Sequence, residues 1–293
     1  MARIRVKDLD VEYEEMGVPA AAPMLLIMGL GAQLKTWDDG FVEALAARGF
    51  RVIRYDNRDS GLSTKMEAAG PPDVMGAIAG DAKPAYTLDD MADDAVGVLD
   101  ALGIRAAHVV GASMGGFIAQ LVAINHPDRV LSLTSIMSGP GGEDTVPPTP
   151  EAGAVLVITP GATREEQLEQ GVMIRRVHVG DGNPFDEAAE RLKAERLHDR
   201  SYYPVGTGRQ LVAILAAKSR LPALAGVRVP TLVVHGLDDP LIPIENGRRV
   251  AAAVPGARMI ELDGTGHDLP RRHWQRVADA IAETARQASP ISA

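Results

Sequence analysis

A serine flanked by small residues is the first feature of this sequence that could do chemistry. Ser113 stands in the run Gly111-Ala112-Ser113-Met114-Gly115-Gly116, between the apolar segment HVV and the helix-like segment FIAQLVAI. A sharp turn from strand to helix needs residues without bulk beside the serine, and it exposes the hydroxyl. The backbone N–H of Met114 would then face the negative charge that develops on the substrate oxygen during attack by the serine. The alternative is a tight glycine-rich turn in which Ser113 only caps the helix.

A serine hydroxyl is a poor nucleophile without a base, and this chain has seven histidines to provide one. His267 follows Gly264-Thr265-Gly266 after the last expected strand, where a flexible loop can carry an imidazole over the strand ends. His235 ends a strand beside an acidic loop, and we expect a structural role for it. The others are expected in a packed strand, a helix end, a helical insertion or an arginine-rich stretch: His108, His126, His178, His198 and His273.

The acid that would orient this base has two candidates. Asp238 and Asp239 both follow the apolar segment TLVVH, and either could accept the second imidazole N–H, fix the tautomer and stabilise the imidazolium. The order along the chain, Ser then Asp then His, is one that such triads use. The residue types alone leave both aspartates open.

Short apolar segments rich in Val and Ile alternate with helix-period stretches, which predicts a mostly parallel sheet flanked by helices. Residues 3–6 and 11–15 alternate apolar and polar side chains like an antiparallel edge. The buried strands are expected at 24–28, 51–55, 107–110, 130–136, 231–235 and 258–262. Helices are expected at 37–48, 88–102 (with Thr87 as N-cap and Gly103 as its stop), 114–125 and within 274–287.

The alternation breaks after Ser138. A Gly- and Pro-rich loop follows, and then residues 163–179, 186–199 and 207–219 have helical periodicity with little strand signal. We therefore expect a core at 1–139, a helical cap at 140–220 inserted after the sixth strand, and the rest of the core at 221–293. The alternative for the insertion is a second domain of another kind.

Composition excludes several classes of function. A net charge of −9 argues against nucleic acid, and mildly against an anionic membrane surface. The chain has no cysteine, so thiolate catalysis and disulfides are excluded. No H-E-x-x-H pattern indicates a metal, and neither G-x-G-x-x-G nor G-x-x-x-x-G-K indicates a nucleotide, so we expect no cofactor. With no signal-peptide-like start and no membrane-length apolar run, we expect a cytoplasmic protein without membrane contact. Oligomeric state stays open, a homodimer being one option.

The segments VVGASMGG, RYDNRDSGLS, LVVHGLDDP and GTGHD, in this order, resemble the α/β-hydrolase superfamily. The resemblance covers the whole chain. MGLGAQLKTW together with RYDNRDSGLS also resembles the branch of aclacinomycin methylesterase and related small carboxylesterases. The resemblance implies that the acid precedes Pro240, which selects Asp239. It also implies a second oxyanion donor after the strand MLLIM, and by position this is the N–H of Leu30. Met28-Gly29 replaces the His-Gly of many relatives, a departure that the methylesterase-like branch shares. In RYDNRDSGLS, the resemblance implies a structural role for Asp56, Arg58, Gly61 and Ser63.

These residues predict an ester hydrolase that works through an acyl-enzyme on a small, largely uncharged ester. Lactonase, carbon–carbon bond hydrolase and cofactor-free perhydrolase chemistry would use the same triad. A ligand-binding sensor with a slow or vestigial triad, and a purely structural protein of the same fold, are the remaining alternatives. Serine at the turn argues against dehalogenase and epoxide hydrolase relatives, which carry aspartate there. Five residues are expected either to line an apolar pocket or simply to pack helices: Met173, Ile174, Leu211, Ile214 and Leu241.

Overall fold

Eight strands form one mostly parallel sheet in the computed structural model, which describes residues 2–179 and 184–288. The strand order is β1-β2-β4-β3-β5-β6-β7-β8. Only the β1–β2 and β2–β4 pairs are antiparallel, and the remaining neighbours are parallel. The strands are β1 (Ala2–Val6), β2 (Leu9–Met16), β3 (Ala22–Ile27), β4 (Phe50–Tyr55), β5 (Ala107–Ala112), β6 (Val130–Ile136), β7 (Thr231–Gly236) and β8 (Arg258–Leu262). The predicted sheet is confirmed.

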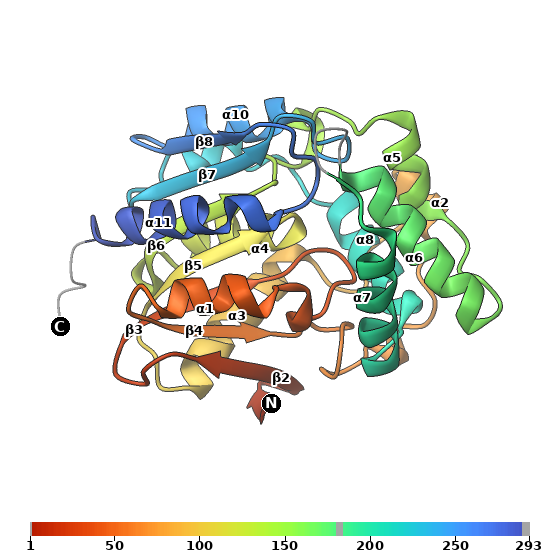
Figure 1. The fold of residues 1–293 in the computed structure, drawn as a ribbon, viewed down its shortest axis with the longest axis horizontal. Coiled ribbons are helices and arrows are strands. Elements are labelled where there is room, and N and C mark those ends of the chain that lie inside the picture. Colours follow the sequence, from red (N-terminus) through yellow and green to blue (C-terminus); the bar gives the residue numbers. More distant parts are fainter. Residues whose placement is uncertain (1, 180–183, 289–293) are drawn as a thin grey trace.

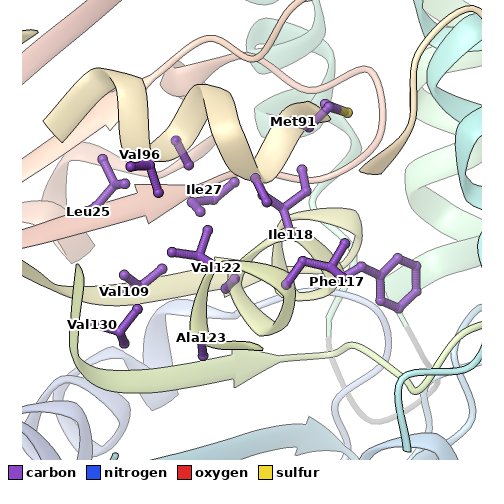
Figure 2. Packing of buried hydrophobic residues seen from close by; sticks show 14 of the residues in the cluster. Leu25, Ile27, Met91, Val96, Val109, Phe117, Ile118, Val122, Ala123 and Val130 are labelled. Carbon is purple, nitrogen blue, oxygen red and sulfur yellow. The ribbon is translucent and has the colours of Figure 1, made fainter. Parts of the chain in front are cut away.

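Helices cover both faces of this sheet (Figure 1). One face carries α1 (Asp39–Ala46) and α11 (Trp274–Ala285), and the other carries α3 (Leu88–Ala101), α4 (Met114–Asn125) and α10 (Ile244–Ala253). Side chains alternate across a strand, so Leu25 and Ile27 of β3 join the core under α3 and α4, whereas Met24 and Leu26 face α1 and α11. Figure 2 shows Ile118 and Val122 of α4 packed in the first of these cores.

Helix α3 begins at Leu88, as predicted, and ends at Ala101, one residue before the predicted end. The Thr87 hydroxyl accepts the N–H of Asp90, while the Asp90 carboxylate accepts the N–H of Thr87, which is a capping box. Gly103 follows the helix with a φ of 68°, a conformation in which glycine carries no Cβ penalty. The capping residues therefore fix a helix that packs directly against α4.

Between β6 and β7 the described residues form helices and no strand. We call residues 137–230 the inserted segment; it contributes α5 (Pro150–Ala154), α6 (Arg164–Val179), α7 (Glu187–Arg200), α8 (Pro204–Leu215) and α9 (Leu221–Leu224). In Figure 1, α5 to α8 gather at one end of the sheet, beside α2 (Val74–Ala79). Because β6 ends there, this is the edge where the parallel strands have their carboxyl ends.

Some elements differ from the sequence-based expectation. Helix α8 spans Pro204–Leu215 rather than 207–219, since Pro204 fits the first turn of a helix, where its missing N–H costs nothing. Helix α10 and the short helices α2, α5 and α9 were not anticipated. Within the described ranges, no helix is long and apolar enough to cross a bilayer.

Candidate active site

Ser113 occupies a strained turn between β5 and α4. Its backbone has a φ of 56° and a ψ of −124°, a region that non-glycine residues rarely adopt. Backbone atoms of other segments pack so closely against this turn that its glycines have no room for a side chain. A Cβ on Gly115, for example, would lie 2.0 Å from the carbonyl oxygen of Ile27. The N–H of Ser113 donates to the Ile136 oxygen at 2.9 Å, and the Ser138 hydroxyl donates to the Ser113 oxygen at 2.9 Å. These contacts hold the serine at the carboxyl edge of the sheet.

An aspartate and a histidine from two other loops meet at this edge. The Nδ1 of His267 lies 2.8 Å from Oδ2 of Asp239. The other oxygen of Asp239 accepts the N–H groups of Leu241 and Ile242 at 2.9 and 2.8 Å. Asp239 is only 5% exposed, whereas Asp238 is exposed and uses its backbone N–H to bond Thr265. Geometry therefore pairs His267 with Asp239 and leaves Asp238 in solvent.

Electrostatics keep Asp239 ionised. Burial by itself would raise the pKa of this carboxyl, but His267 and His235 outweigh burial and leave the pKa well below its usual value. The Nε2 of fully buried His235 lies 3.5 Å from the Asp239 carboxylate and 2.7 Å from the carbonyl oxygen of Ile242. An ionised carboxylate at Nδ1 leaves Nε2 of His267 as the nitrogen that can accept a proton.

Ser113 and His267 share an edge of the sheet because β5 to β8 run parallel and both residues follow strand ends. Among the described residues, no hydrogen bond joins the Ser113 hydroxyl to the imidazole of His267. Catalytic hydrogen bonds are often long without substrate and tighten in the complex. The structure thus brings the aspartate and histidine into contact and places the serine at the same edge.

The loop after β3 lies directly against the serine. A Cβ on Gly29 would come within 2.9 Å of the Ser113 Cβ and 3.4 Å of its hydroxyl oxygen. Asn57 donates to the Met28 oxygen at 2.9 Å and fixes the loop. The N–H of Gly31 donates to the Gln210 side chain at 2.8 Å. No hydrogen bond of the described loop uses the N–H of Leu30, which is therefore available to a ligand.

Met114 is the first residue of α4, where helical N–H groups lack an intrahelical partner. The two expected donors, Leu30 and Met114, thus come from the two loops that converge on Ser113. Developing negative charge on a substrate oxygen between these loops would find unpaired N–H groups and the positive end of a helix.

His178, at the end of α6, contacts the loop that carries His267, and sequence reasoning missed this contact. Its carbonyl oxygen accepts the N–H of His267 at 2.6 Å, and that of Val179 accepts the N–H of Gly266 at 3.0 Å. The rings of His178 and His267 meet edge to face, with centroids 5.7 Å apart. Burial, aided by the charge of His267, lowers the pKa of His178 to about 3, so this imidazole is neutral near pH 7. Nothing in the local sequence around His178 signals this long-range contact.

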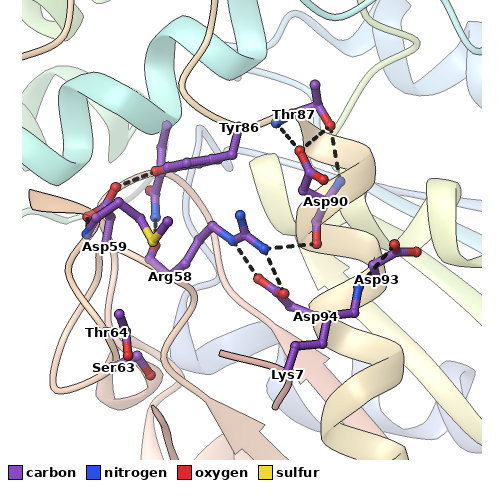
Figure 3. A network of polar contacts seen from close by, with 12 residues as sticks. Lys7, Arg58, Asp59, Ser63, Thr64, Tyr86, Thr87, Asp90, Asp93 and Asp94 are labelled. Atoms are coloured by element: carbon purple, nitrogen blue, oxygen red, sulfur yellow. Dashed lines mark hydrogen bonds and ion pairs between the residues drawn. The ribbon is translucent and has the colours of Figure 1, made fainter. Parts of the chain in front are cut away.

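Buried ion pairs join the inserted segment to the loops at the strand ends. Arg209 of α8 is 2% exposed, and its Nε and Nη2 donate to the two oxygens of the Asp59 carboxylate at 2.8 and 2.9 Å. Tyr86 donates to the same carboxylate at 2.7 Å, and Figure 3 shows this contact beside the pair formed by Arg58 and Asp94. Burial would raise the pKa of Asp59, but Arg209 and the other donors lower it overall.

The loop residue Asp56 receives a second ion pair, from Arg200 at the end of α7, at 2.8 Å. It also accepts the N–H groups of Leu34 and Leu62 at 2.7 and 2.8 Å. Gln33, two residues after Gly31, donates to the carbonyl oxygens of Leu197 and Ser201. These bonds join the inserted helices to the loops beside Ser113.

A cavity of about 580 Å³ lies between the inserted segment and the loop after β3. Of the five expected pocket residues, Ile174 and Leu211 line it. Met173 is 37% exposed and borders a smaller hollow, while Ile214 packs against the core. Leu241 contributes its N–H to Asp239 and does not line the cavity. Gly31 of the loop after β3 and Thr207 of α8 lie against each other, and both line the cavity.

No group of three or more His, Asp or Glu side chains in the described part of the chain is arranged to hold a metal ion.

Family models and known proteins match most of the chain. A family model described as alpha/beta hydrolase fold matches residues 22–168, and one described as TAP-like protein matches residues 202–284. Rhodomycin D methylesterase DnrP of Streptomyces peucetius is 36% identical over 299 aligned positions, covering 94% of this chain and 95% of that protein. A 2-hydroxy-6-oxononadienedioate/2-hydroxy-6-oxononatrienedioate hydrolase of Burkholderia vietnamiensis is 28% identical, covering 96% and 92%.

Solved structures have the same fold. A meta-cleavage product hydrolase from Pseudomonas fluorescens superposes with a TM-score of 0.79 at 20% identity, covering 99% of this chain and 98% of that one. The enol-lactonase from Burkholderia xenovorans gives a TM-score of 0.71 at 25% identity, covering 98% of both chains.

Proposed function

This chain belongs to the α/β-hydrolase family, and from that premise we propose that it is a serine carboxylic-ester hydrolase. The observation that carries the proposal is the 2.8 Å hydrogen bond between buried Asp239 and His267, at the sheet edge where Ser113 sits in a strained turn. The 36% identity to a methylesterase along nearly the full length favours ester chemistry.

The mechanism follows from the positions of these groups. The Ser113 oxygen attacks the ester carbonyl while Nε2 of His267 takes the hydroxyl proton, and Asp239 stabilises the imidazolium. The tetrahedral oxyanion accepts the N–H groups of Leu30 and Met114. When the intermediate collapses, His267 returns the proton to the leaving alcohol. Water, deprotonated by the same imidazole, then releases the carboxylic acid and restores the Ser113 hydroxyl.

Turnover of p-nitrophenyl acetate tests the proposal. Ser113→Ala should lower kcat by at least about a thousandfold while the thermal unfolding temperature stays close to that of the wild type. A fluorophosphonate should add covalently to the peptide containing Ser113, and mass spectrometry should find no adduct in the variant. An active Ser113→Ala protein would overturn the assignment.

Carbon–carbon bond hydrolysis with the same three residues is a second candidate. It is favoured by the full-length similarity to the dienedioate hydrolase of Burkholderia vietnamiensis. Comparing kcat/KM for methyl esters with that for a 2-hydroxy-6-oxo dienoate would decide between them, because the preferred substrate should exceed the other by orders of magnitude.

A further inference from the structure

The cavity under the inserted segment is largely apolar, with one charged region. Three residues with charged side chains line it: Arg175 of α6, and Glu190 and Lys193 of α7. The Nε of Arg175 lies 3.3 Å from a carboxylate oxygen of Glu190, so these two form a pair. Lys193 forms no hydrogen bond or ion pair with any residue that the structure describes. Among the residues that line the cavity, positively charged side chains therefore outnumber negatively charged ones by one.

The surroundings of Lys193 disfavour its charge. Burial lowers the pKa of this amine, and the positive charge of Arg175 lowers it further, against the opposing pull of Glu190, Asp38 and Asp268. An ammonium group has three N–H donors, and the partly buried Lys193 side chain uses none of them in a hydrogen bond with a described residue. An anionic group bound in the cavity would supply acceptors for these donors.

The cavity adjoins the loop that carries the expected oxyanion donor, but Ser113, His267 and Leu30 do not line it. Gly31 lines it and directly follows Leu30, the expected oxyanion donor. Asp268, whose charge acts on Lys193, directly follows His267. Ile174 and Leu211 add apolar side chains to the cavity wall. One elongated molecule could therefore place an ester near Ser113, an apolar middle along the cavity and a charged end at Lys193.

We propose that Lys193 binds an anionic oxygen group, such as a carboxylate, at the end of the substrate remote from the scissile ester. This rests on the proposed function and specifies its substrate class. It replaces the largely uncharged ester expected from the sequence with an ester that carries a negative charge. Lys193 is then a specificity-determining residue, because an equally long neutral ester gains nothing from the ammonium group.

Two matched series of methyl esters test this inference. One comprises monomethyl adipate, suberate and sebacate, and the other comprises methyl hexanoate, octanoate and decanoate, which have the same chain lengths without the carboxylate. The wild type should favour the carboxylate member at one or more lengths. Lys193→Met should remove that preference, lowering kcat/KM for the charged ester by about tenfold or more, chiefly through KM. The neutral series should change little.

Two further variants act as controls. Lys193→Arg retains the positive charge and should retain the preference. Lys218→Met removes an exposed lysine of the inserted segment that does not line the cavity, and it should behave like the wild type. Equal losses for both ester series in Lys193→Met, or a wild type that prefers neutral esters at every length, would overturn the inference.

Binding of suberate to the Ser113→Ala protein, followed by calorimetry, separates this inference from the proposed function. Suberate should bind the Ser113→Ala protein. Its affinity for the Ser113→Ala/Lys193→Met protein should be at least about tenfold lower. If the wild type turns over no ester but the two variants still differ in their affinity for suberate, only the proposed ester hydrolysis is overturned. Equal affinity of the two proteins would overturn only the role of Lys193.

Discussion

The imidazole of His178 meets that of His267 edge to face, with 5.7 Å between ring centroids, and the two residues are also joined through the backbone at 2.6 Å. One histidine comes from the inserted segment and the other from the loop after β8. The inserted segment thus supports the candidate base directly.

This contact predicts how His178 contributes to activity. Edge-to-face ring pairs contribute about 0.5–1.5 kcal/mol, so His178→Ala should lower kcat/KM for p-nitrophenyl acetate by up to about tenfold. His178→Phe keeps a ring and should recover most of the loss. If the Phe variant is as impaired as the Ala variant, the buried Nε2 of His178, which has no partner among the described residues, is needed for a polar contact instead.

The two neighbouring aspartates should differ sharply. Asp239→Asn leaves His267 without an ionised partner and favours the wrong tautomer, so kcat should fall by about 10⁴-fold. Asp238→Asn changes an exposed side chain and should leave kcat within about twofold of the wild type, since surface changes away from a site have small effects. Steady-state kinetics with one ester measures both, and the reverse ranking would reassign the acid.

Two buried histidines should make folding stability depend on pH. Burial lowers the pKa of His108 to about 4 and that of His178 to about 3, from an ordinary 6.5. As the pH falls, the unfolded chain binds these protons first, so the free energy of unfolding should decrease from about pH 6.5 down to about pH 4 through His108 and down to about pH 3 through His178. The lowered pKa values of Asp59 and Asp239 act at lower pH, below the ordinary 3.8.

His108→Gln isolates one of these contributions. The variant lacks the titrating group beside Ser132, so its loss of stability between pH 7 and pH 4 should be smaller than that of the wild type by about 3 kcal/mol. Urea unfolding at several pH values measures the difference. Parallel pH profiles for the two proteins would contradict the assignment.

The Arg209–Asp59 pair should be important for stability. Arg209→Met leaves a carboxylate that is 1% exposed without its main partner, and should lower the free energy of unfolding by about 3–5 kcal/mol. Arg209→Met/Asp59→Asn should recover part of this loss, because the buried charge is gone. Arg191→Met breaks a surface pair with Glu165 and serves as the control, with little change expected. Chemical denaturation compares the three proteins.

The sequence by itself determined the sheet and the position of the serine, because these depend on local patterns. Val- and Ile-rich segments such as 231–235 alternate with amphipathic helices, and glycines flank Ser113 where the chain must turn sharply. The helix signals at Thr87 and Gly103 act within a few residues and were equally readable. The strand-to-helix turn at Ser113, at the edge of a parallel sheet, follows from backbone geometry alone.

Only the tertiary structure decided which groups meet. The residue types could not separate Asp238 from Asp239, but folding buries one against His267 and exposes the other. His178 and Lys193 have no local signal, since their surroundings come from segments far away along the chain. Burial, and with it the pKa and pairing of a charged group, is a property of packing between elements, and periodicity within one element does not encode it.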